Sequence, residues 1–183
     1  NLKIEILAKE ESSKQLTNYS KIQNYTQDFF IKLMSTIEKH VFTQIHNDFN
    51  EFFKEWFNIL IEDENLSLNL DDEFTPIIQQ NGYDTTIDNL SGGEKTAVAL
   101  AYRLALNKVI NDVISDINTK DLIMLDEPTD GFSSEQLDNV REVLTLLNMK
   151  QIVIVSHESK IESFVQNVIR VEKQGHVSSI STV

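Results

Sequence analysis

Two apolar stretches of the chain each end in side chains that could do chemistry. Asp126 and Glu127 follow the apolar residues 122–125, and His157 follows Ser156 and the apolar residues 152–155. Adjacent carboxylates suit phosphoryl transfer to water, because one can hold a magnesium ion, directly or through water, while the other orients or deprotonates the attacking water. We therefore expect Asp126 to be the metal ligand, Glu127 the catalytic base, and His157 a hydrogen-bonding partner of the phosphate.

A third stretch, Leu90–Lys95, has the pattern of a helix start that binds anions. Ser91 can cap the helix, Glu94 stands three residues later to complete a capping box, and two adjacent glycines let a ligand approach the backbone. The free N–H groups and the positive end of the helix dipole then point toward the ligand. The pattern leaves open whether Glu94 does more than close the cap. The candidate cofactor-binding residues are Ser91, Gly92, Gly93, Glu94 and Lys95.

The carboxylates and the histidine fall at the ends of elements that alternate between strand and helix. The first expected strand has a continuous apolar middle, as in a parallel strand covered on both faces. Alternating strands and helices predict an α/β fold in which ligands bind at the carboxyl ends of the strands. We expect strands at Asp121–Asp126, Gln151–Ser156 and Val168–Glu172, helices at about Ser134–Leu147 and Glu158–Gln166, and a turn at Gly175–His176 into a short edge strand.

The residues around Leu90–Lys95 predict the rest of this lobe. Apolar residues cover most of the circumference of a helix expected from Glu94 to about Ser115, so we expect it to be largely buried. The pair Asn81–Gly82 is typical of a type I′ hairpin turn. A small antiparallel sheet is therefore expected ahead of the helix, with strands at Leu66–Leu70, Phe74–Gln80 and Tyr83–Ile87.

The N-terminal part of the chain has the pattern of a long helix. No Gly or Pro occurs from Asn1 to Thr75, and apolar residues recur mostly four apart from Ile22 to Leu60. A single helix over Lys14–Glu62 would be about 70 Å long at about 1.5 Å per residue, too long for a lobe of this size to cover. We expect residues 1–62 to form a protruding coiled-coil arm that needs a partner strand outside this chain, and residues 63–183 to form the lobe. The aromatic residues 49–57 are most simply core packing at the root of the arm, and a docking surface for another protein is the alternative.

Composition narrows the class of protein. The 183 residues are 40% apolar and include no cysteine, which suits one globular domain with an extension and excludes disulfides and thiolate metal sites. The absence of cysteine also favours an intracellular protein. No uncharged apolar run approaches roughly eighteen residues, so we expect no membrane partner. The formal net charge of −13 argues against a broad nucleic-acid surface on this segment. DNA would have to bind mainly elsewhere or through a small local patch.

The chain lacks a loop for gripping the phosphates of a nucleotide. None of its five glycines begins a G-x-x-x-x-G-K-[ST] sequence. The lysine and the backbone amides that hold the β- and γ-phosphates are therefore absent, so we expect part of an ATPase rather than a complete one. The chain begins with Asn1 in the middle of a helical pattern, which predicts a segment of a longer protein.

Together the three stretches resemble the C-terminal lobe of an ABC-type ATPase head. Leu90–Glu94 is similar to the signature motif, Leu122–Glu127 to Walker B, and Ser156–His157 to the switch histidine. Pro128–Thr129 after the glutamate and Glu158 after the histidine resemble the Rad-fifty type. This is the ATPase of the DNA double-strand-break repair complex formed with the Mre-eleven nuclease.

One departure from that family lies in the D-loop that follows Walker B. Phe132–Ser133 stands where the family usually has a Leu-Asp pair. The contact that this aspartate usually makes across the subunit interface is therefore in doubt, and Asp130 is a candidate substitute.

The resemblance implies a lobe that works only in combination. Completed by an N-terminal lobe with the phosphate loop, it would bind ATP and Mg²⁺ and hydrolyse ATP to ADP and phosphate. Two protomers would close head to head as a homodimer, with Ser91 and Gly93 of each on the γ-phosphate of the other's ATP. The closed heads would bind DNA, and the root of the arm would hold and control an Mre-eleven type nuclease. The place would be the cytoplasm or nucleoid, or the nucleus of a eukaryote.

Three other classes remain open. The heads of SMC and RecN chromosome-maintenance ATPases share the arrangement of an arm between two lobes, although SMC heads generally lack Pro-Thr after the glutamate. The nucleotide-binding domain of an ABC transporter carries the phosphate loop upstream in the same compact domain and usually continues the signature with Gln. A coiled-coil scaffold that no longer hydrolyses ATP is favoured by the altered D-loop.

Overall fold

The chain consists of two compact units. The computed structural model describes residues 2–113 and 121–182. Internal contacts separate Asn1–Ile45 from His46–Val183, and each unit is described by itself. The division falls within one long helix, so the last turns of that helix belong to the second unit. A boundary between arm and lobe at residues 62 and 63 stays a prediction.

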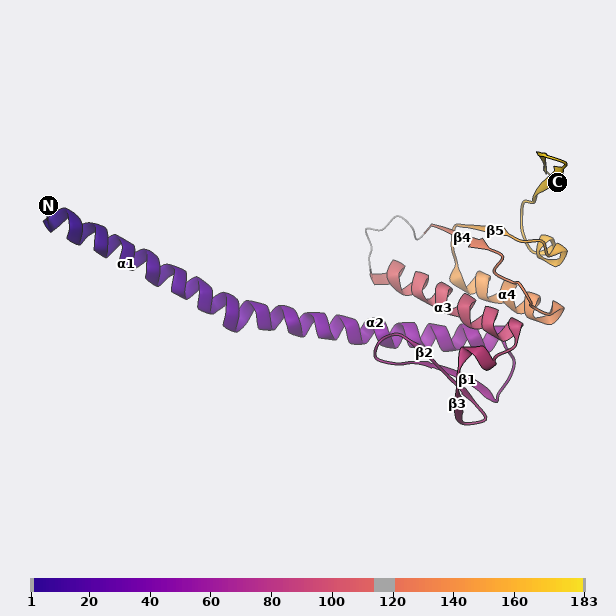
Figure 1. Cartoon of the computed structure of the whole chain (residues 1–183), viewed down its shortest axis with the longest axis horizontal. Coiled ribbons are helices and arrows are strands. Elements are labelled where there is room, and N and C mark those ends of the chain that lie inside the picture. Colours follow the sequence, from indigo (N-terminus) through magenta and orange to yellow (C-terminus); the bar gives the residue numbers. More distant parts are fainter. Residues whose placement is uncertain (1, 114–120, 183) are drawn as a thin grey trace. The chain divides into compact units, whose positions relative to one another are not determined.

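The first unit is helical throughout its described residues. Helix α1 (Leu2–Tyr25) continues through a π-helical turn, η1 (Thr26–Phe30), into α2 (Ile31–Leu60), the indigo and purple ribbon of Figure 1. The predicted long helix is confirmed, and it extends back to Leu2. Neither α1 nor η1 has a buried residue, so Leu16 and Phe29 are exposed. Because a helix gains most of its stability by packing an apolar face, this exposure supports the predicted need for a partner strand.

In the second unit, the end of α2 is part of the core. Phe49, Phe53, Trp56, Phe57 and Leu60 are all buried. The rings of Phe49 and Phe53 lie 4.9 and 5.6 Å from that of Tyr102, in the edge-on geometry that aromatic pairs prefer. Burying each such side chain is worth about 1.5–3 kcal/mol. The interpretation of these aromatic residues as core packing is therefore confirmed.

The small antiparallel sheet forms largely as predicted. Its strands are β1 (Leu66–Leu70), β2 (Pro76–Gln80) and β3 (Tyr83–Thr85), in the order β1-β2-β3. Asn81 and Gly82 have φ angles of 53° and 80°, and positive values at both positions are those of the predicted type I′ turn. The last strand is shorter than expected, because Ile87–Asn89 forms a 3₁₀ turn, η2, that leads into the next helix.

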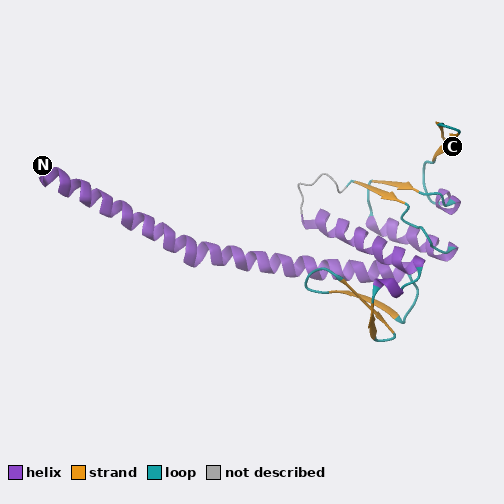
Figure 2. Ribbon diagram, in the orientation of Figure 1, coloured by secondary structure: helices purple, strands orange, loops and turns teal. Residues whose placement is uncertain are grey.

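The core of the lobe joins two helices to a pair of parallel strands. These are α3 (Gly92–Val113), β4 (Leu122–Asp126), α4 (Ser134–Leu147) and β5 (Gln151–Val155). In β4 and β5, Leu122 pairs with Gln151 and Asp126 with Val155. Figure 2 shows α3 and α4 on one side of this strand pair.

The expectation that β4 is covered on both faces is wrong for this chain. Ile123 and Leu125 are buried, but Leu122 and Met124 on the other face are 43% and 69% exposed. Val155, beside Asp126 on that open face, is 53% exposed. An apolar strand pair with one bare face lacks the second layer that normally covers a parallel sheet.

Helix α3 is buried along one side only, so the prediction of a largely buried helix is correct for that side and wrong for the other. Ala97, Leu104 and Val109 are among its buried residues, whereas Leu106, Ile110 and Val113 are exposed. Its start at Gly92 agrees with the predicted helix, and the expected end near Ser115 lies outside the described residues.

The C-terminal elements differ most from expectation. The helix expected at Glu158–Gln166 is a shorter 3₁₀ turn, η3 (Ser159–Ser163). Strand β6 (Ile169–Gln174) pairs antiparallel with β7 (Val177–Thr182) in a separate sheet and does not extend the parallel pair β4-β5. The turn at Gly175 brings β7 back beside β6 after only a few residues, and so short a loop costs little entropy to close.

Candidate functional site

The start of α3 is a complete capping box, as the sequence predicts. The backbone N–H of Ser91 donates to Glu94 Oε2 at 2.7 Å, and the N–H of Glu94 donates to Ser91 Oγ at 3.3 Å. Lys95 Nζ donates to the carbonyl of Asp88 at 3.0 Å, which fastens η2 to the helix. Ser91 and Gly92 are exposed, so the positive end of the α3 dipole faces solvent and is open to an anion.

The two glycines of this loop are needed for different reasons. A Cβ atom on Gly93 would lie 2.9 Å from the carbonyl oxygen of Gly131 and 3.2 Å from Gln136 Oε1. A Cβ atom on Gly92 would have nothing within 4 Å. Gly93 is therefore held against the loop before α4, a contact that the sequence pattern alone does not reveal. Gly131 itself has φ +78°, where a side chain would be strained.

The structure brings Glu127 and His157 together at the carboxyl ends of β4 and β5. His157 Nδ1 lies 3.0 Å from Glu127 Oε2, and the N–H of Glu127 donates to the carbonyl of Val155 at 2.8 Å. On its other side, His157 Nε2 lies 3.6 Å from Glu158 Oε1. Two carboxylates thus flank an imidazole that is exposed to solvent.

The backbone of Glu127 is strained. Its φ of 44° lies in the left-handed region, which costs a residue with a side chain roughly 1–2 kcal/mol. Residues held in such conformations cluster at functional sites, because the surrounding structure must impose them. The strain directs attention to the predicted catalytic base, and no sequence pattern signals it.

Asp126 ends β4 and is exposed. Among the described residues no group of three His, Asp or Glu side chains could hold a metal ion without other ligands. Mg²⁺ in phosphoryl-transfer sites usually takes one or two carboxylates and completes its shell with phosphate oxygens and water. A single exposed carboxylate at a strand end therefore fits the protein's share of a magnesium site.

The start of α4 has a second capping box. The N–H of Ser133 donates to Gln136 Oε1 at 2.8 Å, and the N–H of Gln136 donates to Ser133 Oγ at 3.2 Å. Ser133, at the position where the resembling family has aspartate, thus serves as the helix cap. Ser133 and Gln136 are spaced as in a capping box, so the sequence held a signal for Gln136 that our prediction missed. Whether Asp130 makes a contact across a subunit interface stays untested.

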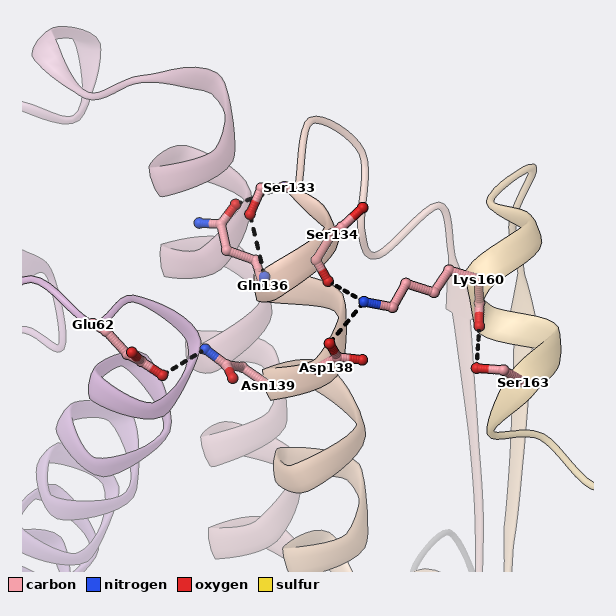
Figure 3. A network of polar contacts seen from close by, with 8 residues as sticks. All are labelled: Glu62, Ser133, Ser134, Gln136, Asp138, Asn139, Lys160 and Ser163. Atoms are coloured by element: carbon pink, nitrogen blue, oxygen red, sulfur yellow. Dashed lines mark hydrogen bonds and ion pairs between the residues drawn. The ribbon is translucent and has the colours of Figure 1, made fainter.

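Polar side chains connect α4 to η3 and to the residues just after α2 in Figure 3. Lys160 Nζ, on η3, donates to the carbonyl of Ser134 and to Asp138 Oδ2, the latter at 2.7 Å. Asn139 Nδ2 donates to Glu62 Oε1 at 3.3 Å, beyond the end of α2. Next to this network, Arg170 forms two hydrogen bonds with Glu162, and that bonding holds the pKa of Glu162 below its usual value.

The predicted site residues form two separate groups. Within Ser91–Lys95 the two glycines lie against the loop before α4, whereas Glu127 and His157 contact each other. Among the residues that the structure describes, no hydrogen bond or ion pair links the first group to Asp126 or to the second. The predicted head-to-head arrangement assigns the two groups to different nucleotides, each held by another segment.

Solved structures show which fold the chain has. The Smc head domain with a coiled coil and joint from Pyrococcus yayanosii matches with a TM-score of 0.72 at 19% identity, over 95% of this chain and 34% of that one. The Smc head domain with an extended coiled coil from Pyrococcus furiosus, bound to the C-terminal domain of ScpA, matches with a TM-score of 0.67 at 20% identity, over 95% of this chain and 45% of that one. The predicted fold class, a lobe of an ABC-type ATPase head with a long coiled-coil helix and a small antiparallel sheet, is confirmed.

Curated relatives narrow the class. The chain is 30% identical over 175 residues to the "DNA double-strand break repair Rad50 ATPase" of Sulfolobus acidocaldarius, which covers 93% of this chain and 19% of that protein. It is 33% identical over 119 residues to the protein of the same name from Thermoplasma acidophilum, which covers 62% of this chain and 13% of that protein. No protein-family model matches the chain.

The chain is therefore a fragment of a Rad50/SMC-type ABC ATPase head. It spans less than a fifth of the length of these two relatives.

Proposed function

We propose that the chain is the C-terminal half of the head of an ATPase that acts in DNA double-strand-break repair. The observation that carries the proposal is the contact between Glu127 and His157 at the ends of β4 and β5. In a Walker B and switch-histidine pair, these are the two side chains that must lie at the γ-phosphate. The names of the relatives supply the repair role.

The bare face of β4 and β5 supports dependence on an N-terminal lobe. Leu122, Met124 and Val155 expose apolar surface beside Asp126, and the sequence has no phosphate loop. A lobe that covers this face would add the missing sheet layer and bring the phosphate grip to the strand ends. ATP turnover then belongs to the assembled head and not to this fragment.

In the assembled head each group of residues has a separate task. Asp126 would hold Mg²⁺, which neutralises phosphate charge when bound. Glu127 orients the attacking water and accepts its proton, and His157 donates a hydrogen bond to the γ-phosphate. Ser91 Oγ and the N–H of Gly93 bind the γ-phosphate held by a second protomer, at the exposed start of α3. Binding of ATP would then shift the heads from open to closed.

The partners follow from the same proposal. A homodimer closed by ATP would bind DNA, and the arm root would hold a nuclease of the Mre-eleven type. The described helices include none that is both long and apolar enough to cross a membrane. We place the protein inside the cell with the DNA.

Substitution of the proposed base tests the proposal. In the full-length parent protein, Glu127→Gln should leave ATP binding intact, lower ATP turnover by about 10²–10⁴-fold and trap the closed dimer, because the amide cannot take the proton from water. Turnover is measured by phosphate release and dimerisation by light scattering. Glu142→Gln is the matched control, since Glu142 is exposed on α4 and lies outside its first turn. Normal hydrolysis by the Glu127 variant would refute the assignment.

A further inference from the structure

The first turn of α4 contacts the loop that starts α3. Gln136 uses its side-chain oxygen to cap Ser133, and the same oxygen lies next to Gly93, where a Cβ atom would come within 3.2 Å. The carbonyl of Gly131 lies closer still to that position, at 2.9 Å. The cap of α4 and the signature loop therefore fit against each other without room for a methyl group. A shift of one requires a shift of the other.

The same turn is fastened to the segment that follows His157. Lys160 lies three residues after the histidine and donates both to the carbonyl of Ser134 and to Asp138 Oδ2. Two acceptors on successive turns of α4 fix the position of the ammonium group better than one does. Figure 3 shows Lys160 reaching from η3 to α4 next to the Ser133–Gln136 cap.

We propose that this first turn of α4 couples the two nucleotide sites of the dimer, with Lys160 and Gln136 as its positioning residues. The inference rests on the proposed function, in which His157 meets the ATP of its own protomer and the signature loop meets the ATP of the partner. Residues 133–138 then lie in the chain of contacts between one γ-phosphate and the other. A change at either phosphate reaches the other through a single rigid helix end.

The contacts of Lys160 with α4 and of Gln136 with Gly93 have the properties that coupling between the two nucleotide sites needs. The two hydrogen bonds of Lys160 are directional and are either made or broken, and Gln136 is in close packing contact with Gly93, so the turn has discrete arrangements rather than a continuous range. The side chains of Lys160 and Asp138 are 33% and 67% exposed, and partly exposed ion pairs contribute little to folding. Their loss should therefore alter communication between the loops far more than it alters stability.

Hydrogen exchange in the nucleotide-free, full-length protein tests the coupling without depending on activity. Lys160→Met should speed exchange in residues 91–95, which Lys160 does not contact, and Gln136→Leu should do the same. Lys160→Arg, which keeps a donor for both acceptors, should restore the slow exchange. Lys150→Met is the matched control, because it removes a lysine paired with Asp121 at 2.9 Å elsewhere in the lobe. Unchanged exchange in residues 91–95 of the Lys160→Met protein would overturn the proposal.

Turnover supplies the second readout. Each single variant should lower kcat by about three- to tenfold with little change in KM for ATP, and the double variant should be no worse than the poorer single variant, because both break one chain of contacts. If the fold-losses in kcat of the two single variants multiplied in the double variant, Lys160 and Gln136 would act independently, and this result would also overturn the proposal. Absence of turnover in the unmodified protein would instead refute the proposed function, while the exchange result would still report on the coupling within the lobe.

Discussion

Two helices of the lobe begin with the same kind of cap, yet the caps face different surroundings. Ser91 and Glu94 close the start of α3, and Ser133 and Gln136 close the start of α4. The first cap is exposed at Ser91 and Gly92, with open space around Gly92. The second is likewise exposed at Ser133, but Gly93 of the signature loop is packed against its Gln136. The same kind of cap thus leaves open space around Gly92 at α3, whereas at α4 it is packed against Gly93.

The largest effect is expected from placing a bulky side chain in the cap of α3. In the full-length protein, Ser91→Arg should abolish ATP-induced dimerisation, because the side chain would fill the place that the proposed function gives to the γ-phosphate. Light scattering with and without ATP measures the effect. Dimerisation that persists in this variant would remove the α3 cap from the nucleotide site.

The two adjacent glycines before α3, Gly92 and Gly93, allow a comparison of open and packed positions within one loop. Gly93→Ala should lower the free energy of unfolding by about 1–3 kcal/mol, because its methyl group would meet the carbonyl of Gly131 at 2.9 Å. Gly92→Ala should change it by less than about 0.5 kcal/mol, since its methyl group would enter open space. Urea unfolding of the two variants gives both values. Equal losses would mean that the contact with Gly131 is absent in solution.

The smallest expected effect distinguishes the two cap serines. Ser133→Ala should cost about 1 kcal/mol of stability, the usual loss for an N-cap hydroxyl, and Ser91→Ala a similar amount. Only the Ser91 variant should also weaken ATP-induced dimerisation after correction for stability. Thermal unfolding and a titration of dimerisation against ATP separate the two effects. Equal weakening by both variants would argue that the caps do not differ in function.

Local sequence patterns predicted the parts of this lobe that are built from local interactions. The capping box at Ser91, the hairpin at Asn81–Gly82 and the helix bounds Ser134–Leu147 each depend on residues a few positions apart. The proximity of Glu127 and His157 could also be predicted, because neighbouring parallel strands have their carboxyl ends at one edge of the sheet. The positive φ at Glu127, however, is encoded by no spacing rule.

Apart from local errors such as the helix expected at Glu158–Gln166, the failures concern surfaces and pairings between distant segments. A continuous apolar run at 122–125 predicted a strand covered twice, but the second layer is not among the described residues. The pairing of β6 with β7 rather than with β5 was decided by the short turn at Gly175. Lys160 gave no signal because its partners, Ser134 and Asp138, lie more than twenty positions away in sequence.

The π-helical turn at Thr26–Phe30 has a consequence for any helix that pairs with the arm. A π turn accommodates one extra residue, and each residue of an α-helix advances by about 100°. The apolar stripe after Phe30 is therefore rotated out of phase with the stripe before Tyr25. A partner helix with an unbroken seven-residue repeat would pack against the apolar stripe on only one side of this turn. A helix that pairs along the whole arm must therefore have a break in its own repeat opposite the π turn.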